Sequence, residues 1–150
     1  MPRHKSVNSL KIVLPAVSVN EGLARSLVGS FAAQLDPSVS ELADIKTAVS
    51  EAVTNCIVHA YPDGYAGTRE IYIYCEYDQN RRFSVRIKDK GIGIEDITRA
   101  REPLFTTSPE TERSGMGFTV MESFCDSVTV KSKKGKGTAV TLIKQIKRLK

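Results

Sequence analysis

Three polar side chains at regular spacing could do chemistry from one side of a helix. Glu51, Asn55 and His59 are four residues apart. Each step of four turns an α-helix by about 400°, so all three lie along one slowly drifting line. A carboxylate there could act as a general base, and an amide oxygen could bind a hard cation such as Mg²⁺. Taken alone, the pattern is more often an ordinary solvated face, and His59 is more typical of a structural histidine at a helix end.

A glycine-rich segment, Asp89-Lys90-Gly91-Ile92-Gly93, follows a predicted buried strand. Its glycines permit a tight turn and a close approach of the backbone to a ligand. The carboxylate of Asp89 could accept a hydrogen bond from the exocyclic amine of adenine, whereas guanine offers an oxygen there, which repels a carboxylate. On its own, the segment is more typical of a plain turn.

A second glycine-rich segment, Ser114-Gly115-Met116-Gly117-Phe118, opens a predicted helix. Backbone amides at a helix N-terminus suit phosphate groups. The segment lacks the lysine of a P-loop and does not follow the dinucleotide-binding pattern. A third turn ends in Thr138, whose hydroxyl could support the base of a nucleotide. Each of these motifs is weak by itself.

The first half of the chain predicts a strand and two helices that carry the candidate base and amide. Residues 10–17 alternate and are β-branched, which predicts a strand, and Asn20 is the expected N-cap of a helix. Ser38 and Glu41 form a capping-box pattern for a second helix that extends to about Ala60. The apolar positions of the first helix, at helical spacing, are Leu23, Leu27, Phe31 and Leu35.

The second half of the chain predicts most of a sheet. Alternating and β-branched patterns predict strands over residues 70–78, 83–88, 127–133 and 138–146. A short helix is predicted over residues 117–124. Between them, residues 98–114 form a long irregular stretch, which inside a compact domain is typical of a functional lid. Helices followed by mostly antiparallel strands predict an α+β, two-layer sandwich with helices on one face of the sheet.

The composition bounds the class of protein. The chain has 150 residues, which predicts a single domain over residues 1–150, and carries 22 basic and 17 acidic residues for a net charge of +5. Its three cysteines are odd in number and form no C-x-x-C pattern, so neither a disulfide framework nor a structural zinc site is expected. No apolar run approaches the ~20 residues of a membrane span. We therefore expect a cytoplasmic protein without a membrane partner, and without direct nucleic-acid binding because no groove-reading motif accompanies the basic ends.

Taken together and in this order, the motifs resemble the nucleotide-binding boxes of the GHKL ATPases, which share the Bergerat ATP-binding fold. The resemblance covers residues 38–142, with the N-box at Glu51-x-x-x-Asn55-x-x-x-His59 and the later boxes at the three glycine-rich turns. Residues 49–55 and 102–118 resemble more closely the anti-sigma F factors of spore-forming bacteria.

The resemblance implies a role for each box residue toward ATP. Asn55 would bind Mg²⁺, Glu51 would act as the general base, and Asp89 would recognise adenine. Arg113, in the lid, would reach the γ-phosphate or a docked partner. The remaining residues expected to contact the nucleotide are Gly91, Gly93, Ser114, Gly115, Met116, Gly117, Phe118 and Thr138.

The resemblance also implies partners. An ATP-bound homodimer would hold a sporulation sigma factor, with Arg25 on the first helix contacting partners, and would phosphorylate a STAS-domain anti-anti-sigma factor on serine. ATP and ADP would then give different partner affinities. The alternatives are a general-stress anti-sigma kinase and a nucleotide-dependent sigma-binding module without phosphotransfer. Glu51 argues against the module, which would not need a base at that position.

Overall fold

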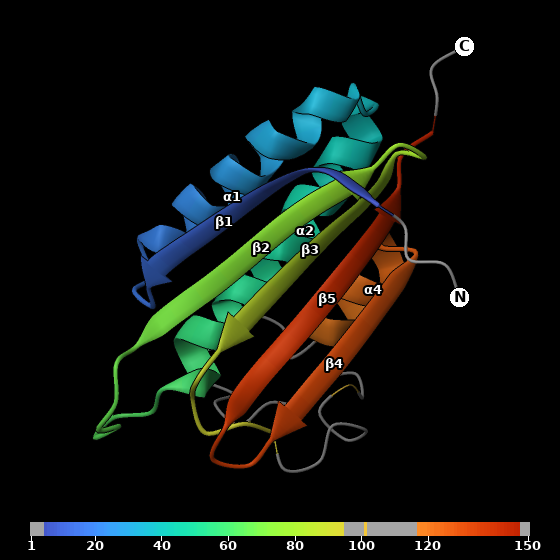
Figure 1. Cartoon of the computed structure of the whole chain (residues 1–150). Coiled ribbons are helices and arrows are strands. Elements are labelled where there is room, and N and C mark those ends of the chain that lie inside the picture. Colours follow the sequence, from blue (N-terminus) through green and yellow to red (C-terminus); the bar gives the residue numbers. More distant parts are fainter. Residues whose placement is uncertain (1–4, 95–100, 102–116, 148–150) are drawn as a thin grey trace.

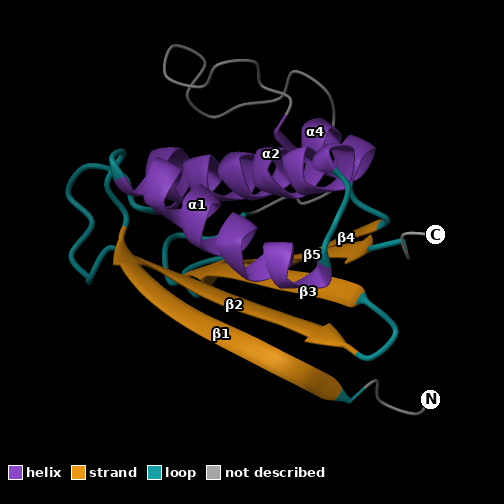
Figure 2. Ribbon diagram, turned by 90° about the horizontal axis from the view of Figure 1, so that it is seen from above, coloured by secondary structure: helices purple, strands orange, loops and turns teal. Residues whose placement is uncertain are grey.

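In the described part of the chain, an antiparallel sheet lies beneath helices α1, α2 and α4 (Figure 1). The computed structural model describes residues 5–94, 101 and 117–147. The strands, in the order β1-β2-β3-β5-β4 across the sheet, are β1 (Ser6–Pro15), β2 (Glu70–Asp78), β3 (Arg82–Asp89), β5 (Gly137–Gln145) and β4 (Ser127–Lys133). The helices are α1 (Asn20–Ala32), α2 (Val39–Asn55) and α4 (Gly117–Phe124). Figure 2 shows all three helices on the same side of the sheet, so the predicted α+β two-layer architecture is confirmed.

The core forms between the helices and the inner face of the sheet. In β2 and β3 every second side chain is buried, and the register pairs Ile73 with Ile87 and Cys75 with Val85. The alternate positions of β2 and β3 face away from the helices, which is the pattern of an antiparallel sheet with one buried face. The hairpin that ends at Asp89 is therefore fixed in register by its apolar residues.

The first helix differs from the prediction at its N-terminus. Asn20 is not the N-cap; it is the first helical residue, and Val19 occupies the cap position without a side-chain hydrogen bond. The Asn20 amide instead donates to the carbonyl oxygen of Pro15 at 2.9 Å. The side chain therefore ties the helix to the end of β1.

The apolar stripe expected for the first helix is only partly buried. Leu23 and Leu27 are 45% and 36% exposed, whereas Ala24, Val28 and Phe31 face the core. A spacing of four residues drifts by about 40° per step around a helix, so a series chosen at that spacing leaves the buried face. The prediction was wrong for these two leucines, which lie at the surface.

The second helix begins as predicted but ends differently. The Glu41 amide donates to Ser38 Oγ at 3.0 Å, and the Ser38 amide donates to Glu41 Oε1 at 2.9 Å, so the capping box is confirmed. The α-helix stops at Asn55, and a π-helical turn, η2 (Cys56–Ala60), follows it. Such turns are rare and frequently lie at functional sites.

Candidate nucleotide-binding site

The end of α2 meets the beginning of α4. A Cβ atom added to Gly117 would lie 3.3 Å from both side-chain polar atoms of Asn55 and 3.5 Å from Glu51 Oε2. The N-box carboxylate and amide therefore lie directly against the glycine that ends the expected phosphate-binding segment. Any side chain at position 117 would fill the space in front of them.

Asp89 lies at the end of β3 and is almost completely buried, with 5% of its surface exposed. Its Oδ1 accepts hydrogen bonds from the amides of Gly91 at 2.9 Å and Thr138 at 3.2 Å. Its Oδ2 lies 3.6 Å from Cys56 Sγ, which donates to it. Burial raises the pKa of Asp89, and the two amides and the thiol act in the opposite direction. The structure thus brings together Asp89 and Thr138, both of which the sequence analysis singled out, through the Thr138 amide, and adds Cys56, which it did not single out.

The glycines after Asp89 pack against the protein's own backbone. A Cβ atom on Gly91 would lie 2.0 Å from the carbonyl oxygen of Ala60, which already accepts a hydrogen bond from the Ile92 amide at 2.9 Å. Gly93 has a φ of +77°, and its Cβ would lie 2.3 Å from the Lys133 carbonyl oxygen. We expected these glycines to allow the backbone to approach a nucleotide closely. In the structure, Gly91 packs against η2 and Gly93 against the β4–β5 turn.

Two tyrosines hold the same turn, a role that no sequence motif indicated. The hydroxyl of Tyr61 accepts from the Lys90 amide at 2.8 Å and donates to the Glu70 carbonyl oxygen at 2.6 Å. The hydroxyl of Tyr65 donates to the Lys90 carbonyl oxygen at 2.6 Å. Both tyrosines follow η2, so the turn after Asp89 is fixed from the C-terminal end of the second helix.

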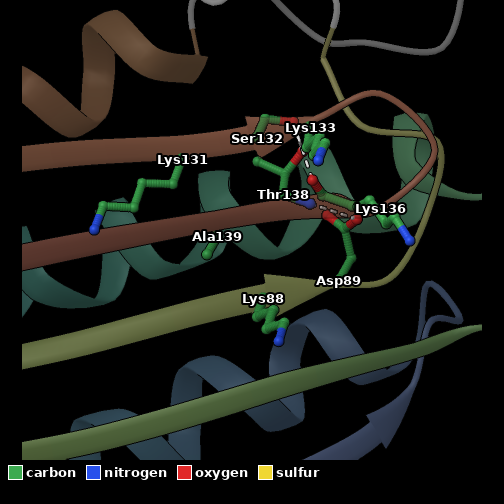
Figure 3. A pocket seen from close by; sticks show the side chains of 9 residues that line it. Lys88, Asp89, Lys131, Ser132, Lys133, Lys136, Thr138 and Ala139 are labelled. Carbon is green, nitrogen blue, oxygen red and sulfur yellow. Dashed lines mark hydrogen bonds between the residues drawn. The ribbon is translucent and has the colours of Figure 1, made fainter.

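A cavity of about 240 Å³ lies beside Asp89 at the end of the sheet (Figure 3). Figure 3 shows the Asp89 carboxylate directed toward the amide of Thr138, with lysine side chains around them. The Thr138 hydroxyl is 2.7 Å from Ser132 Oγ. Glu51 and Asn55 do not line this cavity, so it adjoins only the Asp89 side of the candidate site. Its lining residues are Lys88, Asp89, Lys131, Ser132, Lys133, Lys136, Gly137, Thr138 and Ala139.

Arg25 lies on α1 and is connected to the end of α2. Its guanidinium lies 3.5 Å from Glu21 Oε1, and Glu21 also accepts a hydrogen bond from Ser50 Oγ. Ser50 directly precedes Glu51 in the chain. The exposed arginine expected to contact partners is therefore linked, through two side chains, to the residue next to the expected base.

His59 lies in η2, beyond the end of the α-helix. A π-turn contains more residues per turn than an α-turn, so the line drawn through Glu51 and Asn55 at α-helical spacing does not continue to position 59. The predicted alignment on one side of the helix therefore applies to Glu51 and Asn55, and it is interrupted at Cys56, where the π-turn begins.

Several expected site residues lie outside the described residues: Arg113, Ser114, Gly115, Met116 and, apart from Arg101, the lid over 98–114. The Arg101 Nε donates to Glu122 Oε1 at 2.8 Å, which links Arg101 to α4. The Phe118 side chain is buried in the core, so a ligand could reach only its backbone. Within the described ranges, the helices include none long and apolar enough to span a membrane.

Comparison with known proteins assigns the family. The sequence-family model of the histidine kinase-like ATPase domain matches residues 14–144 of this chain. Proteins named anti-sigma F factor are 48% identical in Clostridium acetobutylicum, over 92% of this chain and 94% of the relative, and 49% identical in Oceanobacillus iheyensis, over 95% and 96%. One from Clostridium perfringens is 50% identical over 93% of this chain and 97% of the relative.

The chain belongs to the anti-sigma F factor family. The resemblance carried by the N-box and the glycine-rich turns is thereby confirmed at the level of the family. A solved structure of the RsbU and RsbW domains of a Mycobacterium tuberculosis protein superimposes with a TM-score of 0.70 over 95% of this chain and 34% of that chain, at 18% identity. This likeness shows that members of the anti-sigma F family share their GHKL-type fold with more distant proteins.

Proposed function

We propose that the chain is an anti-sigma factor and an ATP-dependent serine kinase. It would bind Mg²⁺-ATP, sequester a sporulation sigma factor and phosphorylate a STAS-type anti-anti-sigma factor on serine. The observation that carries the proposal is the packing of Gly117 against Glu51 and Asn55, because it joins the expected base, the expected metal ligand and the expected phosphate segment. The names of the relatives support the sigma-factor partner.

The residues around the expected nucleotide fit its chemistry. The two amides bind Asp89 Oδ1, and Oδ2, which accepts from the Cys56 thiol, has a second lone pair that could accept from the adenine amine. Asn55 offers a neutral amide oxygen, which suits a Mg²⁺ ion that keeps several waters and phosphate ligands. Among the described residues, no group of three or more His, Cys, Asp or Glu side chains could enclose a metal. Binding of the ion would therefore depend on the nucleotide, which supplies the phosphoryl group and most of the ligands.

The protein's own part in the transfer would be positioning and proton transfer. Glu51 would accept the proton of the serine hydroxyl of the antagonist, as carboxylates do in phosphoryl transfer. The backbone amides of residues 114–118 would hold the phosphates at the start of α4. Arg113 would offset the charge that develops on the transferred group.

Partners would bind at α1. Arg25 lies on this helix together with exposed apolar side chains, of which Leu23 is 45% and Leu27 36% exposed. Such a mixture of apolar area and an arginine is typical of protein interfaces. The connection from Arg25 through Glu21 to Ser50, beside Glu51, provides a physical route by which the bound nucleotide could change partner affinity in an ATP-bound homodimer.

The test is transfer of labelled phosphate. Purified protein is mixed with magnesium, ATP labelled at the γ-phosphate and a candidate STAS antagonist. We expect the wild-type protein to label the antagonist on serine. Glu51→Gln should lower the rate by about 100-fold or more, since removal of a general base costs about that much, and should leave ATP affinity within about twofold.

The matched control is Glu76→Gln, which changes a carboxylate on β2 that accepts a hydrogen bond from Tyr74. This variant should retain wild-type transfer. A wild-type protein that binds ATP and a sigma factor but labels no antagonist would instead be a sigma-binding module without phosphotransfer. Preferential binding of a general-stress sigma factor would favour the general-stress kinase.

A further inference from the structure

A buried thiol lies against the carboxylate expected to recognise adenine. Cys56 is the first residue of η2 and is 4% exposed. Its Sγ lies 3.6 Å from Asp89 Oδ2, within the range of a sulfur hydrogen bond. The oxygen that faces the thiol is the one that the backbone amides of Gly91 and Thr138 leave unoccupied, because both of these donate to Oδ1.

The hydrogen bond from Cys56 limits how many further donors the Asp89 carboxylate can accept. A carboxylate can accept about four hydrogen bonds, two on each oxygen. The two amides use both positions of Oδ1, and the thiol of Cys56 uses one position of Oδ2. Counting only donors from the described residues, one position on Oδ2 remains, and it suits the exocyclic amine of a base. The thiol thus fixes the direction in which the last acceptor position of Asp89 points.

The chemistry of the thiol suits a donor. Burial raises the pKa of the Cys56 thiol well above its usual range, and the negative charge of Asp89 acts in the same direction. The S–H of Cys56 donates to the Asp89 carboxylate. A hydrogen bond to a carboxylate is stronger than one between two neutral groups when the carboxylate is ionised.

We propose that Cys56 is a positioning residue for nucleotide recognition, which orients Asp89 Oδ2 toward the amine of adenine and so increases selectivity against bases without that amine. The inference rests on the proposed function, because it needs adenine nucleotide at Asp89. A cysteine that only fills space in the core would support the fold without distinguishing one base from another.

The test compares ATP with inosine triphosphate, which carries an oxygen in place of the amine. Dissociation constants are measured by calorimetry with magnesium for the wild-type chain, Cys56→Ala and Cys56→Ser. We expect Cys56→Ala to weaken ATP binding about three- to tenfold, the range of one lost hydrogen bond, while inosine triphosphate changes less than about twofold. Cys56→Ser keeps a donor and should restore the selectivity for ATP to within about twofold of wild type.

The chain offers a matched control in Cys75, a second buried cysteine, whose side chain packs in the core on β2. Cys75→Ala removes the same atoms and should leave the ratio of the two dissociation constants unchanged. Cys56→Val fills the space without a donor. It should lower the ratio of the dissociation constant of inosine triphosphate to that of ATP as much as Cys56→Ala does. This comparison separates the effect of the lost hydrogen bond from the effect of lost side-chain volume. Thermal unfolding of each variant verifies that it is folded.

Two results would overturn the inference while leaving the proposed function intact. In one, Cys56→Ala and Cys56→Val bind ATP and inosine triphosphate with the wild-type ratio. In the other, Cys75→Ala changes that ratio as much as Cys56→Ala does. If the folded wild-type chain binds neither nucleotide, the proposed function fails first and the inference fails with it.

Discussion

At the scale of single residues, burial of Asp89 carries an energetic cost for the fold. Asp89 is a nearly fully buried carboxylate, and burial raises its pKa despite the hydrogen bonds that it accepts. A raised pKa means that ionisation of Asp89 is less favourable in the folded chain than in the unfolded one. The fold therefore keeps a destabilising charge, which is expected where a side chain is held for a ligand.

This cost gives Asp89→Asn a defined pH dependence. The folded chain holds a proton on Asp89 to a higher pH than the unfolded chain, where the pKa is about 3.9. The wild-type free energy of unfolding therefore falls as pH rises through the window between the unfolded and the folded pKa, and stays lower above it. Asparagine does not titrate, so we expect the stability of Asp89→Asn relative to wild type to grow across that window.

Urea unfolding at a series of pH values from about 3.5 to 8 measures the difference. The free energy of unfolding of Asp89→Asn minus that of wild type should increase with pH. It should become constant once Asp89 is ionised in both the folded and the unfolded wild-type chain. A difference that shrinks as pH rises would mean that the hydrogen bonds from Gly91, Thr138 and Cys56 outweigh burial, and that ionised Asp89 stabilises the fold.

Residue types and spacing singled out some residues of the candidate site and not others. Asp89, Thr138, Glu51 and Asn55 could be singled out because each belongs to a local motif of a few residues. Cys56 could not, since its partner is 33 positions away in the chain and only the fold brings the two together. A lone cysteine within an apolar helix pattern is indistinguishable from a core residue.

At the scale of elements, the π-turn η2 and the turn after Asp89 form one packed unit. The Ala60 carbonyl oxygen accepts from the Ile92 amide, and Gly91 packs against the same oxygen. The Tyr61 hydroxyl bridges the Lys90 amide and the Glu70 carbonyl oxygen. The position of Asp89 therefore depends on where the second helix ends.

Tyr61→Phe tests this dependence. The change removes a hydroxyl that satisfies two backbone groups at a tyrosine only 6% exposed. We expect the free energy of unfolding to fall by about 1–3 kcal/mol, the cost of leaving buried polar groups without a partner. ATP affinity should fall as well, because the turn that carries Asp89 loses its anchor.

The control is Tyr72→Phe, which removes a hydroxyl that donates to the Glu70 side chain on the face of the sheet away from the helices. Its effect on stability should stay within about 0.5 kcal/mol, as for most surface changes. Denaturant unfolding and ATP titration of both variants make the comparison. Equal ATP affinity in Tyr61→Phe and wild type would mean that the turn holds its position without the tyrosine.

In the part of the chain that the structure describes, local patterns predicted every α-helix and strand, while their details depended on tertiary contacts. The capping box of α2 and the bounds of β2, α4 and β4 follow from neighbouring residues, so they could be predicted. The exposure of Leu23 and Leu27 and the π-turn could not, because each is set by what the helix packs against. The predicted helix to Ala60 contained no glycine or proline that would have indicated the change at Cys56.

At the scale of the whole molecule, helices α1 and α2 connect the candidate nucleotide site to the surface. Helix α1 packs beside α2, and the contacts from Arg25 to Glu21 and from Glu21 to Ser50 cross between them. A partner bound at α1 would therefore lie close to the element that carries Glu51. This arrangement allows coupling between partner and nucleotide without a second domain.

Arg25→Ala should separate partner binding from nucleotide binding. We expect the affinity for a sporulation sigma factor, measured by fluorescence anisotropy in the presence of ATP, to fall about tenfold or more, as at interface arginines that act as anchors. ATP affinity should change less than about twofold. The control is Arg82→Ala, at an exposed position of β3, which should bind the sigma factor and ATP with wild-type affinity. Unchanged sigma affinity in Arg25→Ala would exclude the arginine from the interface.

The most direct measurement is calorimetric titration of the well-folded chain with ATP and with ADP in the presence of magnesium. We expect saturable binding of a nucleotide to each chain, weakened about tenfold or more in Asp89→Asn, which replaces the acceptor for the adenine amine with a side chain that can present a donor. If folded wild-type protein takes up neither nucleotide, then no residue around Asp89, Asn55 and Glu51 has the role proposed for it.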